Sequence, residues 1–128
     1  MPTPPARLLR LHHAQITYPI DGEGRAREFY CGLLGLREIP KPEVLQARGG
    51  FWLELGSLQV HCSVEDGVDR KATKAHLAYQ VEDLESWRTL LVSKGFSPQD
   101  GTPIPGMVRF EFRDPFGNRI EFLELRAS

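Results

Sequence analysis

The chain has 128 residues, of which 41% are hydrophobic and 26% are charged, and a formal net charge of −1. These values are typical of one soluble globular domain, and the lack of a basic excess argues against a nucleic-acid partner. No run approaches the roughly 20 apolar residues of a membrane span. No signal-peptide pattern opens the chain, so we expect a cytoplasmic protein with no membrane partner. Cys31 and Cys62 lack redox or zinc-ribbon spacing and are expected to be free thiols.

The first half of the chain has the pattern of a strand, a helix and a hairpin. A proline-rich lead-in gives way near residue 7 to alternating apolar and polar residues, and a later helical stripe ends at Gly35. A tight Gly56-Ser57 turn joins two further alternating segments. We therefore predict, in order, a strand over 9–18, a helix over 24–34 and a hairpin over 51–55 and 58–64.

The second half repeats this order, with a strand over 74–81, a helix over 84–94 and a hairpin over 108–113 and 118–125. Equivalent positions are 63 residues apart for His13 and His76, and 60 apart for His61 and Glu121. This internal repeat predicts a single α+β domain over residues 1–128. It is built from two βαβββ modules, about 7–66 and 73–126, whose curled mixed sheet forms a cleft.

One face of the predicted sheet collects the candidate site residues. Alternate side chains of a strand point to opposite faces, so the apolar positions should pack under the helices and the polar positions should face the cleft. An imidazole and carboxylate cluster suits a divalent ion such as Fe, Mn, Co, Ni or Zn. A solvated face explains the same alternation without ligands, but it would not place candidates at equivalent positions of both modules. The polar set is His13, Gln15, His61, His76, Arg109, Arg113 and Glu121.

Several of these positions are candidates for contact with a small-molecule substrate. A guanidinium at Arg109 or Arg113 would clamp a carboxylate or phosphate, or would instead pair with a neighbouring glutamate. Gln15 lies on the same face, and Trp52 is expected to form an apolar wall of the pocket or a dimer contact. Residues 98–106, rich in proline and glycine, are expected to form a loop over the cleft mouth.

Three segments carry a family resemblance: residues 12–19, 76–83 and 114–122. They resemble the vicinal oxygen chelate superfamily, which includes glyoxalases, bleomycin-resistance proteins and extradiol dioxygenases. The most specific piece is the Asp-Pro-x-Gly-Asn-x-Ile-Glu sequence that begins at Asp114. The resemblance implies a homodimer with clefts completed across chains, and one metal ligand from the first and the last strand of each module. The matching positions are His13, His61, His76 and Glu121.

The resemblance also implies a function, a divalent-metal-dependent lyase, isomerase or dioxygenase that acts on a small substrate through its vicinal oxygens. Glyoxalase I has a glutamate where this chain has His61, and a carboxylate pair is implied in its proton transfer. Glu121 is therefore the expected catalytic carboxylate, and His61 is a fourth ligand, a general base or a hydrogen-bond partner. His13, His76 and Glu121 resemble a 2-His-1-carboxylate triad. The alternative is a metal-free, ligand-sequestering protein of the bleomycin-resistance type.

Overall fold

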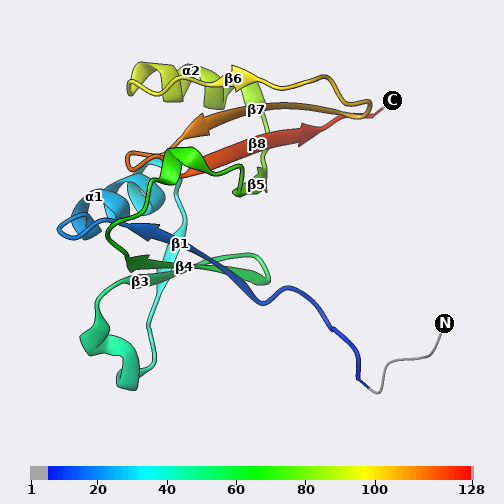
Figure 1. Cartoon of the computed structure of the whole chain (residues 1–128). Coiled ribbons are helices and arrows are strands. Elements are labelled where there is room, and N and C mark those ends of the chain that lie inside the picture. Colours follow the sequence, from blue (N-terminus) through cyan, green and yellow to red (C-terminus); the bar gives the residue numbers. More distant parts are fainter. Residues whose placement is uncertain (1–5, 128) are drawn as a thin grey trace.

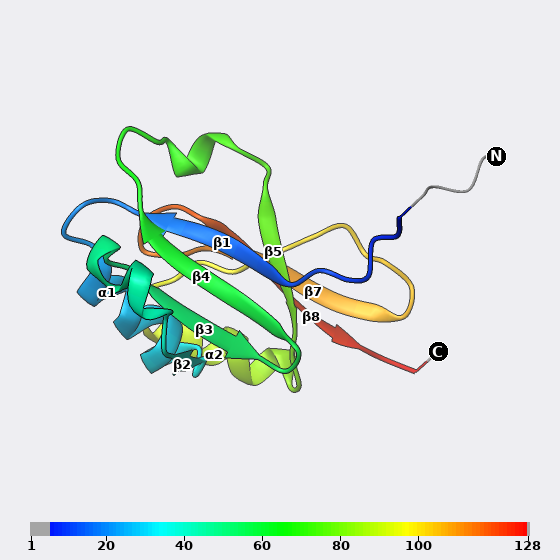
Figure 2. The ribbon, with the colours of Figure 1, turned by 90° about the horizontal axis from the view of Figure 1, so that it is seen from below.

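The first module forms a four-stranded sheet in the order β1-β4-β3-β2, in a computed structural model that describes residues 6–127. The strand β1 runs parallel to β4, and the other neighbours are antiparallel. Figure 2 shows β1, β4 and β3 side by side, with the α1 region along one face. The elements are β1 (His13–Tyr18), α1 (Glu23–Arg27), the π-helix η1 (Glu28–Leu33), β2 (Arg37–Ile39), the 3-10 helix η2 (Glu43–Arg48), β3 (Phe51–Leu55) and β4 (Leu58–Val64).

The second module repeats this topology with the strand order β5-β8-β7-β6 and a parallel β5–β8 pair. Its helix lies on the outer side of its sheet (Figure 1). The two βαβββ units confirm the predicted fold class. The elements are η3 (Arg70–Ala72), β5 (His76–Gln80), α2 (Leu84–Ser93), β6 (Gln99–Asp100), β7 (Met107–Arg113) and β8 (Arg119–Leu125).

The element boundaries differ from the predicted ones where the sequence pattern is weak. The first strand begins at His13 rather than at residue 9, and residues 6–12 extend away from the body with exposed Leu8 and Leu9 side chains (Figure 1). The edge strands β2 and β6 have three and two residues, too few to display alternation. No helix among the described residues is long and apolar enough to cross a membrane.

The apolar faces of both sheets form the core, as the strand alternation predicts. Val60 and Cys62 of β4 are buried, and so are Phe110 and Phe112 of β7. Cys62 is a free thiol, as is Cys31. Burial of this kind is worth roughly 1.5–3 kcal/mol per large apolar side chain, so the sheets are held by their inner faces and the opposite faces are left for polar groups.

Hydrogen bonds from the turn that begins at Asp114 link the second module to the first. The Asp114 carboxylate accepts hydrogen bonds from the Tyr30 hydroxyl at 2.6 Å and from the Phe116 and Asn118 amides at 2.9 and 2.8 Å. The Asn118 side chain donates to the carbonyl of Thr17 in β1 at 2.9 Å. The most family-specific motif of the chain is therefore a structural clamp between modules, and it orients the start of β8.

Candidate metal centre

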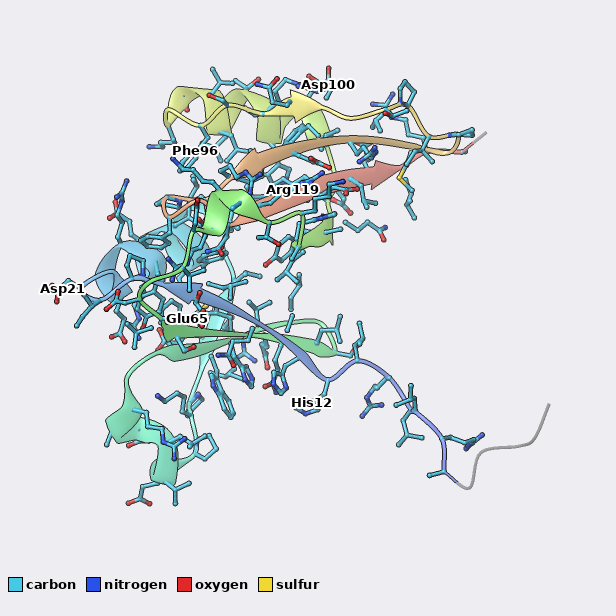
Figure 3. The ribbon with its side chains drawn as sticks, in the orientation of Figure 1. His12, Asp21, Glu65, Phe96, Asp100 and Arg119 are labelled. Atoms are coloured by element: carbon cyan, nitrogen blue, oxygen red, sulfur yellow. The ribbon has the colours of Figure 1, made fainter. Side chains whose placement is uncertain are left out.

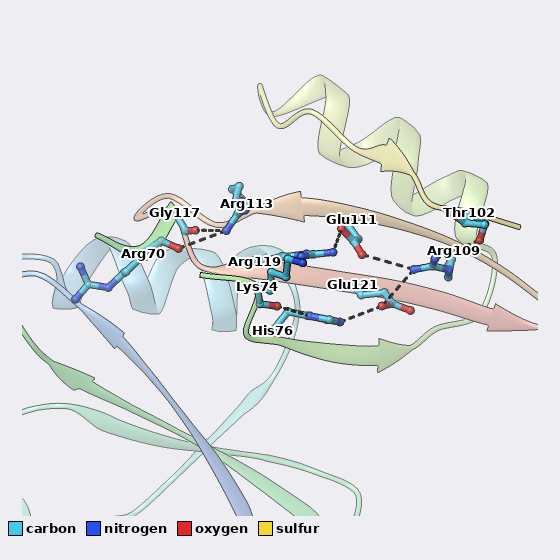
Figure 4. Close-up of polar contacts among 10 residues, drawn as sticks. All are labelled: Arg70, Lys74, His76, Thr102, Arg109, Glu111, Arg113, Gly117, Arg119 and Glu121. Carbon is cyan, nitrogen blue, oxygen red and sulfur yellow. Dashed lines mark hydrogen bonds and ion pairs between the residues drawn. The ribbon is translucent and has the colours of Figure 1, made fainter. Parts of the chain in front are cut away.

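The polar face of the second sheet brings together one imidazole and two carboxylates (Figure 4). One ligand atom each from His76, Glu111 and Glu121 lie within 4.8 Å of one another. Strand register explains this grouping: Glu111 on β7 pairs directly with Glu121 on β8, and His76 pairs with Arg119, two residues before Glu121. Directly opposed and diagonal residues on one face of a sheet are close enough for side-chain contact.

The His76 ring is oriented like that of a metal ligand. Its Nδ1 lies 2.9 Å from the carbonyl oxygen of Lys74, which can only accept, so Nδ1 carries the proton of this bond. In the neutral ring Nε2 then keeps a lone pair, and it lies 3.2 Å from Oε1 of Glu121. Two lone pairs at this separation need a proton or a cation between them. A backbone carbonyl on the far nitrogen is also the usual support of a metal-bound histidine.

Two arginines neutralise the carboxylates of this group. Arg109 Nη1 lies 3.5 Å from carboxylate oxygens of both Glu111 and Glu121, and Arg119 Nη2 lies 2.5 Å from Oε2 of Glu111. The Arg119 guanidinium is the main cause that holds the pKa of the Glu111 carboxyl below its usual value. A chain of ion pairs therefore runs across the strands from Glu121 through Arg109 and Glu111 to Arg119, and the His76 ring contacts its Glu121 end.

The polar face of the first sheet carries a stack of three rings. The His61 ring lies 4.0 Å from that of His13 and 3.9 Å from that of Trp52, with nearly parallel planes. Its Nε2 lies 2.8 Å from Oε1 of Gln59. Burial, with smaller effects of the neighbouring histidines, lowers the pKa of His61 to about 4. His61 is therefore neutral near pH 7, and the bond to Gln59 leaves Nδ1 as an acceptor.

The four ligands predicted from the sequence lie in two pairs within one chain. His13 and His61 stack in the first module, and His76 and Glu121 are in contact in the second. His13 and His76 both line a cavity of about 740 Å³, whose walls do not include His61 or Glu121. The described part of the chain holds one group of three or more close metal-ligating side chains, and Glu111 is its third member.

The four residues predicted to contact a substrate all make contacts within the chain. Gln15 donates to the Ser63 hydroxyl at 2.6 Å, and Trp52 belongs to the ring stack. Arg109 is largely buried and donates to the carbonyl of Thr102, in the segment expected to cover the cleft. Arg113 is exposed and donates to the carbonyls of Gly117 and Arg70 at 3.1 and 3.4 Å.

Sequence reasoning missed Glu111 and Arg119 as site residues. Alternation places Glu111 on the polar face, but only the register of β7 against β8 sets it opposite Glu121. Arg119 shares the parity of Glu121 and forms the shortest ion pair of the cluster. A row-by-row pairing of the predicted hairpin would have found both residues.

Comparisons with known proteins agree with this architecture. The sequence model of the Glyoxalase/Bleomycin resistance protein/Dioxygenase superfamily matches residues 10–122, and the chain therefore belongs to that superfamily. A solved protein assigned to the glyoxalase family, from Bacillus anthracis, is 37% identical with a TM-score of 0.84, over 94% of this chain and 98% of its own. No curated protein sequence matches the chain.

More distant structures share the fold alone. A glyoxalase/dioxygenase from Nostoc punctiforme is 19% identical, with a TM-score of 0.80 over 99% of this chain and 98% of its own. The fosfomycin resistance protein FosX from Listeria monocytogenes is 14% identical, with a TM-score of 0.73 over 91% of each chain. Such likenesses fix the architecture, and the chemistry has to be argued from the side chains.

Proposed function

We propose that the chain is a divalent-metal-dependent enzyme that acts on a small substrate through its vicinal oxygens. The observation that carries the proposal is the geometry of His76 and Glu121, where the imidazole Nε2 lies 3.2 Å from a carboxylate oxygen while Nδ1 is engaged by the carbonyl of Lys74. The donor set also fits, because nitrogen and carboxylate ligands suit Fe, Mn, Co, Ni and Zn. Membership of the superfamily supports the same conclusion.

The proposal assigns His76 and Glu121 as ligands, with Glu111 as the third donor of the same chain. A bound ion would supply Lewis acidity toward the two substrate oxygens. Glu121 would also hold or move a substrate proton. His61, which is neutral near pH 7, would accept a proton or a hydrogen bond at Nδ1, beside an apolar wall formed by Trp52.

We also propose a homodimer that completes each site across two chains. His13 and His61 lie on the polar face of the first module, whereas His76 and Glu121 lie on that of the second. Packing the first module of one chain against the second module of another would place the two pairs on facing walls of one cleft. This arrangement would unite the four positions that the family resemblance implies.

One observation favours a different function, a metal-free protein that sequesters a ligand. Arg109 and Arg119 already balance the charges of Glu111 and Glu121, so these four side chains carry no net charge without an ion. A divalent ion would have to compete with both guanidinium groups for the carboxylates. A protein of this kind would bind its ligand equally well after treatment with a chelator.

Metal content of the purified protein separates these two functions. We expect near-stoichiometric divalent metal in the wild type by elemental analysis. Loss of an outer-shell partner alone costs about 10–100-fold in metal affinity, so His76→Ala and Glu121→Gln should each lose at least that much.

The matched control is Glu38→Gln, which removes a carboxylate paired with Arg27 outside the site and should leave the metal content unchanged. A wild type that is isolated without metal, and takes up none of Fe, Mn, Co, Ni or Zn, would contradict the enzyme and favour the sequestering protein.

A further inference from the structure

A second cavity, of about 780 Å³, adjoins the metal-ligating group beside the last residues of β7 and the turn into β8. Glu111 belongs both to its wall and to the group with His76 and Glu121. The wall also includes three cationic side chains, from Lys71, Arg113 and Arg119. The cavity is thus a cationic space that shares a carboxylate with the candidate metal centre.

The negative charges on this wall are already engaged. The Asp114 carboxylate is buried and holds the Tyr30 hydroxyl and two backbone amides. Glu111 pairs with Arg119 at 2.5 Å. The two hydrogen bonds of Arg113 go to backbone carbonyls, which satisfy its donors without cancelling its charge.

Strand register places Arg119 between the two sites. His76, Arg119 and Arg113 form one row across β5, β8 and β7, and Glu121 and Glu111 belong to the next row along the strands. Arg119 therefore lies beside the metal-ligating carboxylates and also in the cavity wall. Figure 3 labels Arg119 on the second sheet, close to the η3 segment that carries Lys71.

The charges around the site, once a metal ion is bound, decide which kind of substrate it would accept. The guanidinium groups of Arg109 and Arg119 balance the carboxylates of Glu111 and Glu121. A divalent ion at these carboxylates leaves an excess of two positive charges, and it draws Glu111 away from Arg119. An excess of this size in a partly buried space is costly unless an anion is bound there.

We propose that the substrate is an anion, with its vicinal oxygens at the ion near His76 and Glu121 and a separate negative group held by Arg119. This inference rests on the proposed function and adds to it a substrate class and a specificity-determining residue. A guanidinium binds a carboxylate or a phosphate through two parallel hydrogen bonds. Arg113 and Lys71 also line the cavity and supply further positive charge.

The test compares two probes of similar shape, one anionic and one neutral. Protocatechuate carries a catechol and a separate carboxylate, whereas 3,4-dihydroxybenzamide carries the same catechol and a neutral amide. Binding to zinc-loaded protein is measured by calorimetry, with the metal content of each sample determined alongside. Wild type should prefer protocatechuate. Because a charge-assisted hydrogen bond contributes roughly 1.5–3 kcal/mol, Arg119→Gln should weaken protocatechuate by about tenfold or more and leave the amide unchanged.

The control is Arg88→Gln, which removes a guanidinium that pairs with Asp100 and Glu85 away from the cavity. The inference is overturned if zinc-loaded wild type binds both probes equally, or if Arg119→Gln leaves the affinity for protocatechuate unchanged or weakens both probes alike. If the wild-type protein binds no zinc, the proposed function is contradicted, and the anion inference is contradicted with it. The metal measurement therefore tells the two failures apart.

Discussion

At the scale of single residues, His61 shows how neighbours set the chemistry of a side chain. Its ring lies between those of Trp52 and His13, at centroid distances of 3.9 and 4.0 Å. Burial is the main cause that lowers its pKa from 6.5 to about 4, because removing the ring from water disfavours its charged form. The sequence places His61 on the polar face but does not predict the stack, which depends on the register of β3 and β4.

This environment makes the pH behaviour of His61 measurable. In chelator-treated protein, the His61 resonance followed by NMR should titrate near pH 4. Trp52→Ala should raise the pKa toward the ordinary value, because it opens the ring to solvent. In the unfolded chain, the His61 ring takes up a proton below about pH 6.5. The stability that the neutral ring contributes to the folded state is therefore full above that pH and is lost as the pH falls toward 4. A wild-type pKa near 6.5 would contradict this description.

The ion pairs of the site depend on contacts of individual residues, and Arg109 shows this. Alternation correctly places Arg109 on the same face as Glu121, but it cannot show that Arg109 contacts both Glu111 and Glu121. A substrate role for Arg109 stays a prediction, since its guanidinium is already shared between two carboxylates. Arg119 was not predicted as a site residue from the sequence, yet it lines the cavity beside the metal-ligating group.

At the scale of elements, the hairpins are the most predictable part of the chain. Their alternation and glycine turns predicted Phe51–Leu55 and Leu58–Val64 with the bounds that the structure has. The short strands β2 and β6 were not predicted individually, because strands of three and two residues have no period to detect. The first strand begins late because its neighbour β4 begins at Leu58, and the register pairs His13 with Gln59.

The Asp114 turn offers a sharp test of the clamp between modules. Asp114→Ala leaves the buried Tyr30 hydroxyl and two amides without their acceptor. Leaving buried donors unsatisfied costs roughly 1–3 kcal/mol each, and we expect a loss of about 3 kcal/mol or more in the free energy of unfolding by urea denaturation.

The matched control for the clamp is Asp100→Ala. That carboxylate is exposed and pairs with Arg88 on the surface, where an ion pair is worth roughly 0–1 kcal/mol. Equal losses in the two variants would show that the turn does not hold the modules together.

At the scale of the whole molecule, the repeat is what makes the site interpretable. Two copies of one topology present His13 and His61 on one polar face and His76 and Glu121 on the other. The sequence predicts that these four positions belong together, but it does not say whether one chain or two bring them together. Within one chain they form two separate pairs, and the proposed homodimer accounts for that division.

Anomalous diffraction from wild-type crystals soaked in manganese would show directly whether His76 and Glu121 hold a metal ion. We expect a peak within coordination distance of Nε2 of His76 and of a carboxylate oxygen of Glu121, with His13 of a second chain on the facing wall. No peak at His76 and Glu121 in crystals that bind manganese elsewhere, or bind none, would contradict a metal-dependent enzyme at this site.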